Sequence, residues 1–248
     1  MSDGTTIVYV YDGSFEGLLC VVYESFCKKE RPVMIFSQDE PQETLYPVRE
    51  IITDLEQAQK VEASIKSKIS RLALEFVRCC YYSAEARREE MILNFLRIGY
   101  RVGPSVTNLL SHDLAAPLLQ TAQTVQREAI AYRNFARFSD FNGALAAIIA
   151  PIHFVLPLLA PYFCDRFPSE DFLIYDETHS AAFLYQGGQG ELLRIEGFEL
   201  PAPSEKEEAY RALWKRFYKA ISIEARENPK RRMGHMPKRY WRHMTEFL

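Results

Sequence analysis

The sequence has little cysteine and no excess of positive charge. It contains five cysteines in 248 residues with no C-x-x-C pair, and this odd number is atypical of the disulfide framework of a secreted protein. Lysine and arginine together number 30 against 33 aspartates and glutamates, which gives a formal net charge of −3. These counts exclude a uniformly basic, nucleic-acid-binding chain, and any such surface must be local. We expect the cysteines to be reduced thiols.

The chain also lacks the pattern of a targeting segment. Its N-terminus shows no basic region followed by a long apolar stretch, so we expect a cytoplasmic protein. Residues 143–163 carry no charged side chain and are numerous enough to span a bilayer as a helix. Pro151, Pro157 and Pro161 would break the backbone hydrogen bonds that such a helix needs. This run therefore predicts buried core, and no membrane partner is expected.

The hydrophobic pattern predicts an α+β fold with a predominantly helical middle. Apolar residues at helical spacing indicate one long helix or two abutting ones after Asp54, a helix over residues 84–100 and a third from about Asp113. A further helix should begin at the capping box of Ser204 and Glu207, and its apolar face is rich in aromatic residues.

Small, mostly antiparallel sheet elements are expected at the N-terminus and around residues 141–195. The N-terminal strands are predicted over residues 5–11, 33–36 and 48–52, and residues 172–175 with 181–185 predict a hairpin. No repeat or low-complexity linker divides the chain, so residues 1–248 are predicted to form a single compact domain. Within it, residues 1–53 could form an N-terminal sub-part, and residues 228–248 form a basic C-terminal tail.

Two polar turns contain the candidate catalytic side chains. Asp12 follows the first expected strand in the turn Asp12-Gly13-Ser14, which is also typical of a helix-capping turn. Asp176, Glu177 and His179 lie at the tip of the predicted hairpin, close enough to one another to act as acid and base. A solvent-exposed turn is the alternative for these three. No residues have metal-ligand spacing, so neither a metal nor a cofactor is predicted.

The most informative stretch is the tail. Between Arg226 and Arg242 there are seven lysines or arginines against one acid, Glu227, with two aromatic residues among them. Cations neutralise phosphates, and aromatic rings stack on unpaired bases, so this mixture suits a nucleic-acid strand. The alternative is a basic tail whose aromatic residues pack onto the body of the protein. The candidate nucleic-acid contacts are Lys230, Arg231, Arg232, Lys238, Arg239, Tyr240, Trp241 and Arg242.

Two terminal motifs carry a resemblance to a known family. The segments Tyr11–Leu19 (YDGSFEGLL), Asn228–Lys230 (NPK) and His235–Trp241 (HMPKRYW) are similar to the end motifs of a bacterial family of DNA-metabolism and DNA-repair proteins. Residues 128–138 and 172–176 resemble the central segments of that family, so the resemblance covers essentially the whole chain.

This resemblance implies a role in DNA repair or modification. It also implies a partner, a radical-SAM DNA-repair protein encoded beside the family member, and a relationship to a region fused to uracil-DNA-glycosylase-like domains. The chain lacks the radical-SAM three-cysteine cluster motif, so it would be the companion of that enzyme.

The sequence thus predicts an accessory protein that binds DNA, single-stranded or damaged, through its basic tail. One alternative is an enzyme that acts on a damaged or modified base, with Asp12, Asp176, Glu177 or His179 lining its pocket. The other alternative is a docking module for the radical-SAM partner, formed by the tail and the helix over residues 204–226, without its own DNA contact.

Overall fold

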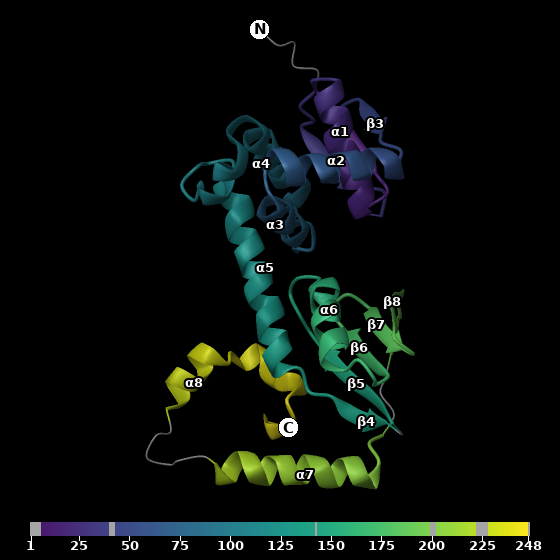
Figure 1. Ribbon diagram of the computed structural model, residues 1–248, viewed down its shortest axis with the longest axis vertical. Coiled ribbons are helices and arrows are strands. Elements are labelled where there is room, and N and C mark those ends of the chain that lie inside the picture. The colour runs from purple at the N-terminus through teal and green to yellow at the C-terminus, as the bar shows by residue number, and fades with distance from the viewer. Residues whose placement is uncertain (1–5, 40–42, 142, 199–201, 222–227, 248) are drawn as a thin grey trace. The chain divides into compact units, whose positions relative to one another are not determined.

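The computed structural model describes residues 6–39, 43–141, 143–198, 202–221 and 228–247. The chain divides into two compact units, residues 1–126 and 127–248, and the boundary falls within helix α5 (Ala116–Phe135) (Figure 1). Each unit combines helices with one small sheet. The predicted α+β class is therefore confirmed, whereas a single domain over the whole chain stays a prediction.

A parallel three-stranded sheet forms the start of the first unit. Strand β1 (Val8–Tyr11) lies between β2 (Met34–Ser37) and β3 (Val48–Glu50) and is parallel to both. Helix α1 (Phe15–Cys27) connects β1 to β2 and returns the chain to the same end of the sheet, as a parallel pair requires. The expectation of mostly antiparallel pairing at the N-terminus was therefore wrong, although the strands themselves were predicted.

Helices make up the rest of the first unit. The apolar stripe after Asp54 belongs to two helices, α2 (Leu55–Lys68) and α3 (Arg71–Tyr81). They are separate because Ser70 caps α3, with its Oγ accepting a hydrogen bond from the backbone N–H of Ala73 at 3.0 Å. Helix α4 (Arg88–Val102) and the 3-10 helix η1 (Gly103–Asn108) follow, and one hydrophobic core joins this sheet to the helices. Its largest buried side chains include Tyr9, Tyr11, Leu18, Ile65, Phe95 and Leu118.

The adjacent cysteines of α3 are part of this packing. Cys79 and Cys80 are both buried free thiols. Burial raises the pKa of Cys79 to about 11 and that of Cys80 to about 12. Both therefore stay protonated at neutral pH and act as small apolar packing groups.

The second unit contains a mixed five-stranded sheet in the order β4-β5-β6-β7-β8. Its strands are β4 (Ser139–Phe141), β5 (Ala144–Ile149), β6 (Phe172–Asp176), β7 (Ala181–Gln186) and β8 (Gln189–Arg194). Strands β5 and β6 are parallel because helix α6 (Leu156–Arg166) connects them, and the other neighbours are antiparallel. Strands β6 and β7 form the predicted hairpin, and α6 lies beside the sheet (Figure 1).

The uncharged run over residues 143–163 is core, as predicted. It supplies strand β5, a bend at residues 152–153 and most of α6, and it buries Ile149, Leu156, Leu159 and Phe163. Among the described residues, no helix is both long and apolar enough to cross a membrane.

The chain then forms helix α7 (Glu205–Ala220), helix α8 (Pro229–His235) and the 3-10 helices η3 (Lys238–His243) and η4 (Thr245–Phe247). The predicted cap of α7 is present, since Ser204 Oγ accepts a hydrogen bond from the backbone N–H of Glu207 at 3.2 Å. Residues 222–227, which include Arg226 and Glu227 of the basic stretch, lie outside the described residues, as does residue 5 of the first predicted strand.

Gly17 in α1 provides a test of the packing around the N-terminal turn. A Cβ atom at this position would lie 2.1 Å from Asp12 Oδ1 and 2.8 Å from Thr53 Oγ1. We expect Gly17→Ala to lower the free energy of unfolding by about 1–3 kcal/mol in urea denaturation, because the Asp12 carboxylate must give up its position. Gly234→Ala in α8 is the control, since a Cβ there meets no atom within 4 Å. Equal stability of both variants and the wild type would contradict this packing.

Candidate nucleic-acid interface

Asp12 belongs to the first unit and holds the turn after β1. Its carboxylate accepts hydrogen bonds from the Ser14 backbone N–H at 3.0 Å, from Ser14 Oγ at 2.7 Å and from Thr53 Oγ1 at 2.7 Å. Burial works to raise the pKa of Asp12, but the hydrogen bonds from Ser14 and Thr53 prevail and hold it below its ordinary value. Ser14 in turn caps α1 by accepting from the Gly17 N–H at 2.9 Å. The geometry is that of a capping turn.

Asp176, Glu177 and His179 belong to the second unit, where Asp176 is the last residue of β6. Asp176 has 0% relative exposure, so the alternative of a solvent-exposed turn is wrong for this residue. Its Oδ1 accepts hydrogen bonds from the backbone N–H groups of Thr178 and His179 at 3.0 and 3.2 Å, and its Oδ2 lies 2.7 Å from His179 Nδ1. The carboxylate is buried because these donors satisfy it within the turn.

Glu177 connects this hairpin turn to the tail. Its Oε1 lies 2.6 Å from Arg242 Nη1 and 3.4 Å from His243 Nε2. The structure thus brings a candidate catalytic residue and a candidate nucleic-acid contact into one ion pair. Arg242 nevertheless remains largely exposed to solvent.

Tyr240 anchors the tail to α5. The ring is buried and lies edge-on to Tyr132, with ring centroids 5.0 Å apart, and at 5.2 Å from Phe135. Arg239 donates a hydrogen bond to the Tyr240 hydroxyl at 2.6 Å and lies 3.5 Å from the buried carboxylate of Glu128. Burial raises the pKa of Tyr240, so the hydroxyl stays neutral in this site.

Trp241 packs within the tail itself. Its ring stacks on Phe247 at 4.3 Å with an interplanar angle of 15°, and the Arg232 guanidinium lies 5.5 Å from its ring centroid. Its Nε1–H donates to the backbone carbonyl of Met236 at 3.0 Å. These contacts fix the shape of the segment after α8.

The six candidate cations of the tail are all on the surface. Within the described part of the chain, carboxylates lie within ion-pair distance of two of them, Arg239 and Arg242. The other four have no such carboxylate among the described residues, so their charges attract mobile anions from solvent. These four are Lys230, Arg231, Arg232 and Lys238.

An ion pair that the sequence does not predict connects the tail to the rest of the unit. Arg137 donates to both carboxylate oxygens of Glu246, at 2.6 and 3.2 Å, and the Trp214 Nε1–H donates to the same carboxylate at 3.0 Å. The Glu246 side chain is 1% exposed. Arg137 and Glu246 are 109 residues apart, so no local spacing could have indicated the pair.

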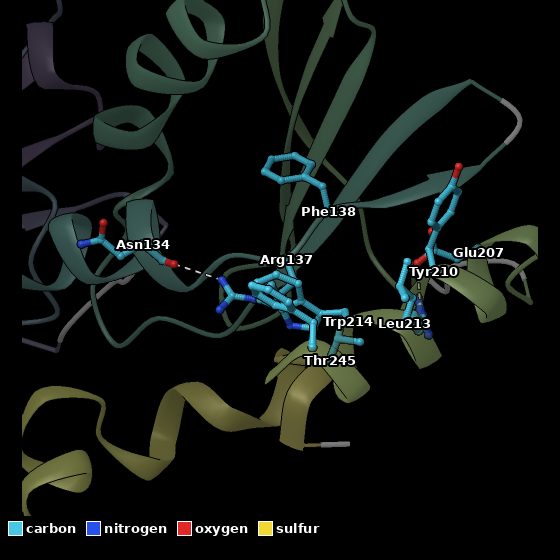
Figure 2. A pocket seen from close by; sticks show the side chains of 10 residues that line it. Asn134, Arg137, Phe138, Glu207, Tyr210, Leu213, Trp214 and Thr245 are labelled. Carbon is cyan, nitrogen blue, oxygen red and sulfur yellow. Dashed lines mark hydrogen bonds and ion pairs between the residues drawn. The ribbon is translucent and has the colours of Figure 1, made fainter. Parts of the chain in front are cut away.

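A groove of about 830 Å³ lies beside this ion pair, between α7 and the segment that follows α5 (Figure 2). Its walls are mainly apolar and aromatic. Arg137 and Trp214 lie at one end, and Tyr210 and Leu213 lie nearer the N-terminus of α7. The lining residues are Asn134, Arg137, Phe138, Glu207, Tyr210, Arg211, Leu213, Trp214, Phe217 and Thr245.

The second unit is therefore an α+β fold that carries an anchored basic tail and an apolar groove. The family of domains of unknown function called DUF4130 matches residues 86–246, and the chain belongs to this family. The matched region begins just before α4 and includes the mixed sheet, α7 and nearly all of the tail. No curated protein and no solved structure matches the chain.

Replacement of Tyr240 tests the anchor. Tyr240→Ala leaves a cavity beside Tyr132 and should weaken the docking of the tail by about 3–5 kcal/mol, the usual cost of deleting a buried aromatic ring. Limited trypsin digestion followed by mass spectrometry should show faster cleavage after Lys238, Arg239 and Arg242. Tyr240→Phe keeps the ring and should be cleaved nearly as slowly as the wild type. Unchanged cleavage of Tyr240→Ala would show that another contact anchors the tail.

The Glu246 ion pair predicts a dependence of stability on pH. Burial works to raise the pKa of Glu246, but hydrogen bonds from Arg137 and Trp214 prevail and lower it. A carboxyl group with a lowered folded-state pKa stabilises the fold fully above its unfolded pKa of about 4.3 and loses this effect as the pH falls through the folded value.

Glu246→Gln should therefore lower the free energy of unfolding by about 3 kcal/mol at pH 7, as expected when a buried pair is broken. The difference from the wild type should shrink below about pH 4, because the wild-type carboxyl then also becomes neutral. Glu208→Gln, at an exposed position of α7, is the control and should show a much smaller difference in urea denaturation at each pH. A deficit of Glu246→Gln that is the same at pH 7 and pH 3 would contradict this account.

Proposed function

We propose that the second unit binds nucleic acid by neutralising backbone phosphates with the cations of its tail. The observation that carries this proposal is the set of four exposed cations, Lys230, Arg231, Arg232 and Lys238, without carboxylate partners among the described residues. Cations that replace the counterions condensed on a nucleic acid gain free energy from the release of those ions. Arg239 and Arg242 contribute less because Glu128 and Glu177 already balance their charges.

The anchoring of the tail supports this proposal. Tyr240 is buried against α5 and Trp241 stacks on Phe247, so both rings hold the segment in place. A segment that is already fixed loses less conformational entropy when it binds a ligand. The cations are thus presented on a preformed surface.

We take DNA as the nucleic acid, and repair or modification as the process, from the resemblance of the two end motifs to DNA-repair proteins. The same resemblance supports a radical-SAM protein as the partner. The tail motifs that carry it, Asn228–Lys230 and His235–Trp241, include two of these four cations, Lys230 and Lys238.

A triple charge reversal tests the binding surface. Lys230→Glu, Arg231→Glu and Lys238→Glu leave Arg232, which lies over the rings of both Trp241 and Phe247, in place, while Lys238 lies 5.9 Å from the Trp241 ring centroid only. The variant should bind labelled DNA about tenfold more weakly in fluorescence anisotropy, and its plot of log affinity against log salt concentration should be less steep by about 2 to 3 for duplex DNA.

The matched control reverses three exposed cations of the first unit and so changes the net charge equally. It carries Lys68→Glu, Arg71→Glu and Arg101→Glu. It should keep most of the affinity and the wild-type slope. If both variants lose affinity equally, net charge rather than the tail determines binding, and the proposal fails.

A second candidate function is an enzyme that acts on a damaged or modified base. The observation that favours it is the buried Asp176 carboxylate 2.7 Å from His179 Nδ1. Such a pair orients the imidazole, and His179 Nε2 has no hydrogen-bond partner among the described residues, so it is available to exchange a proton. His179→Gln should then abolish any mass change in oligonucleotides that carry modified bases while DNA affinity stays unchanged. Turnover by His179→Gln at the wild-type rate would exclude this role.

A further inference from the structure

Two basic side chains of the tail lie beside the same oxygen atom of Glu177. Its Oε1 is 2.6 Å from Arg242 Nη1 and 3.4 Å from His243 Nε2. Glu177 belongs to the turn after β6, whereas Arg242 and His243 are the last two residues of η3. Two positive charges beside one oxygen compete for it, so the protonation of His243 decides whether Arg242 has a competitor.

The ring of His243 is only partly satisfied in this arrangement. Its Nε2 atom is buried and has no hydrogen-bond partner among the described residues, although Glu177 Oε1 is 3.4 Å away. A buried polar atom without a partner is uncommon in a native fold, because its desolvation costs free energy. A proton on the ring offsets this cost, since an imidazolium donates from both nitrogens and is attracted by the adjacent carboxylate.

The two basic side chains differ in exposure. Arg242 is 70% exposed, whereas the His243 side chain is 25% exposed. An exposed ion pair contributes at most about 1 kcal/mol, because solvent screens it and a long side chain must be held in one conformation. The guanidinium of Arg242 is therefore more easily displaced from Glu177 than a protonated His243 ring.

Glu177 is the acid that faces His243. In the part of the chain that the structure describes, no other carboxylate lies within ion-pair distance of this ring. Three further acids on the segments that contact η3 lie within ion-pair distance of Arg239, His179 and Arg137 instead. The charged and titratable groups on these segments include Glu128 and Tyr132 on α5, Asp176 and His179 on the turn, Arg232 on α8 and Glu246 on η4.

Arg242 adjoins the cations already proposed to bind phosphates. It follows Trp241, whose ring centroid lies 5.5 Å from Arg232 and 5.9 Å from Lys238. While Glu177 holds the guanidinium, the two charges cancel for a phosphate that approaches from solvent. Once released, Arg242 adds a further cation to the same surface.

We propose that Arg242 is a fifth phosphate contact of the tail and that a proton on His243 makes it available. The neutral ring leaves Arg242 paired with Glu177. Imidazoles ordinarily gain a proton as the pH falls from about 8 to about 5. The imidazolium of His243 then takes Glu177 Oε1 as its partner, and Arg242 turns to the phosphate, so binding of nucleic acid strengthens as the pH falls. This inference rests on the proposed function and names its regulation by pH.

The salt dependence of binding counts phosphate contacts and therefore tests this inference. Affinity of the full chain for a rhodamine-labelled oligothymidylate is measured by fluorescence anisotropy over a salt series at about pH 5.5 and about pH 8. For the wild type, the plot of log affinity against log salt concentration should be steeper by about 0.7 at the lower pH, and affinity at 0.15 M salt should be about fourfold higher, as expected for one more contact with a single strand. Equal slopes at both pH values would overturn the inference.

Three variants assign the effect to the named groups. His243→Gln cannot gain a proton and should show the wild-type slope of pH 8 at both pH values. Arg242→Gln lacks the added contact and should do the same. Glu177→Gln removes the carboxylate that holds Arg242 and should show the steeper slope at both pH values. The full pH effect in either His243→Gln or Arg242→Gln would show that other groups cause it.

The matched control is His235→Gln. His235 is the exposed histidine of α8 and follows Arg231 and Arg232 in the chain. This variant should keep the difference between the two slopes. If His235→Gln abolishes the difference and His243→Gln keeps it, the titrating group lies on α8 and the inference is wrong.

The outcomes also separate this inference from the proposed function. If the triple charge reversal weakens binding but the wild type binds equally at both pH values, the tail binds phosphates without this switch. If the wild type binds no DNA at either pH, the proposed function fails and Arg242 has no phosphate to contact.

NMR of the Arg242 guanidinium measures its release without DNA. Rotation about its Nε–Cζ bond should be faster at about pH 5.5 than at about pH 8 in the wild type, because the ion pair with Glu177 hinders it. In His243→Gln the rotation should be equally slow at both pH values. Rotation in the wild type that does not change with pH would show that His243 does not control Arg242.

Discussion

The buried carboxylate of Glu246 joins three segments of the second unit near the C-terminus of the chain. Through one buried group it connects Arg137, which follows α5, and Trp214 in the middle of α7 with the C-terminal segment that carries the cations. A buried carboxylate is stable only when its charge is paired and its oxygens are hydrogen-bonded, because an unpaired buried carboxylate is costly. The position of α7 relative to the tail therefore depends on this polar contact, while the buried ring of Tyr240 holds the tail against α5.

The features that could be predicted from the sequence are those set by neighbouring residues. Proline in an uncharged run placed the break between β5 and α6, and the capping box at Ser204 placed the start of α7. The sense of strand pairing in the N-terminal sheet could have been inferred from the strand-helix-strand order, but a short strand alone carries no information about its direction. The burial of Asp176 could not be predicted, because a turn of polar residues looks the same whether its carboxylate faces solvent or is satisfied by backbone donors.

The roles of the aromatic residues at the candidate site could not be predicted from the sequence either. The sequence alone does not distinguish two pairs of aromatic residues. Tyr240 and Trp241 have cations near them in the chain, and so do Tyr210 and Phe217. The structure distinguishes them, because Tyr240 is buried by Tyr132 and Phe135, which lie more than a hundred residues earlier, whereas Tyr210 and Phe217 have no such cover in the described chain. Helical periodicity predicted an apolar face on α7 correctly, but periodicity reports which side is apolar and not what packs against it.

The unequal burial of the five thiols has a practical consequence for spectroscopy. Cys27 is exposed, Cys20, Cys79 and Cys80 are buried, and Cys164 lies between these extremes with a pKa that burial raises. Because only the thiolate reacts with maleimides, and buried thiols with raised pKa values supply little of it, Cys27 should accept a dye long before the others. A single fluorophore can thus be attached to the first unit of the native protein without removing any cysteine.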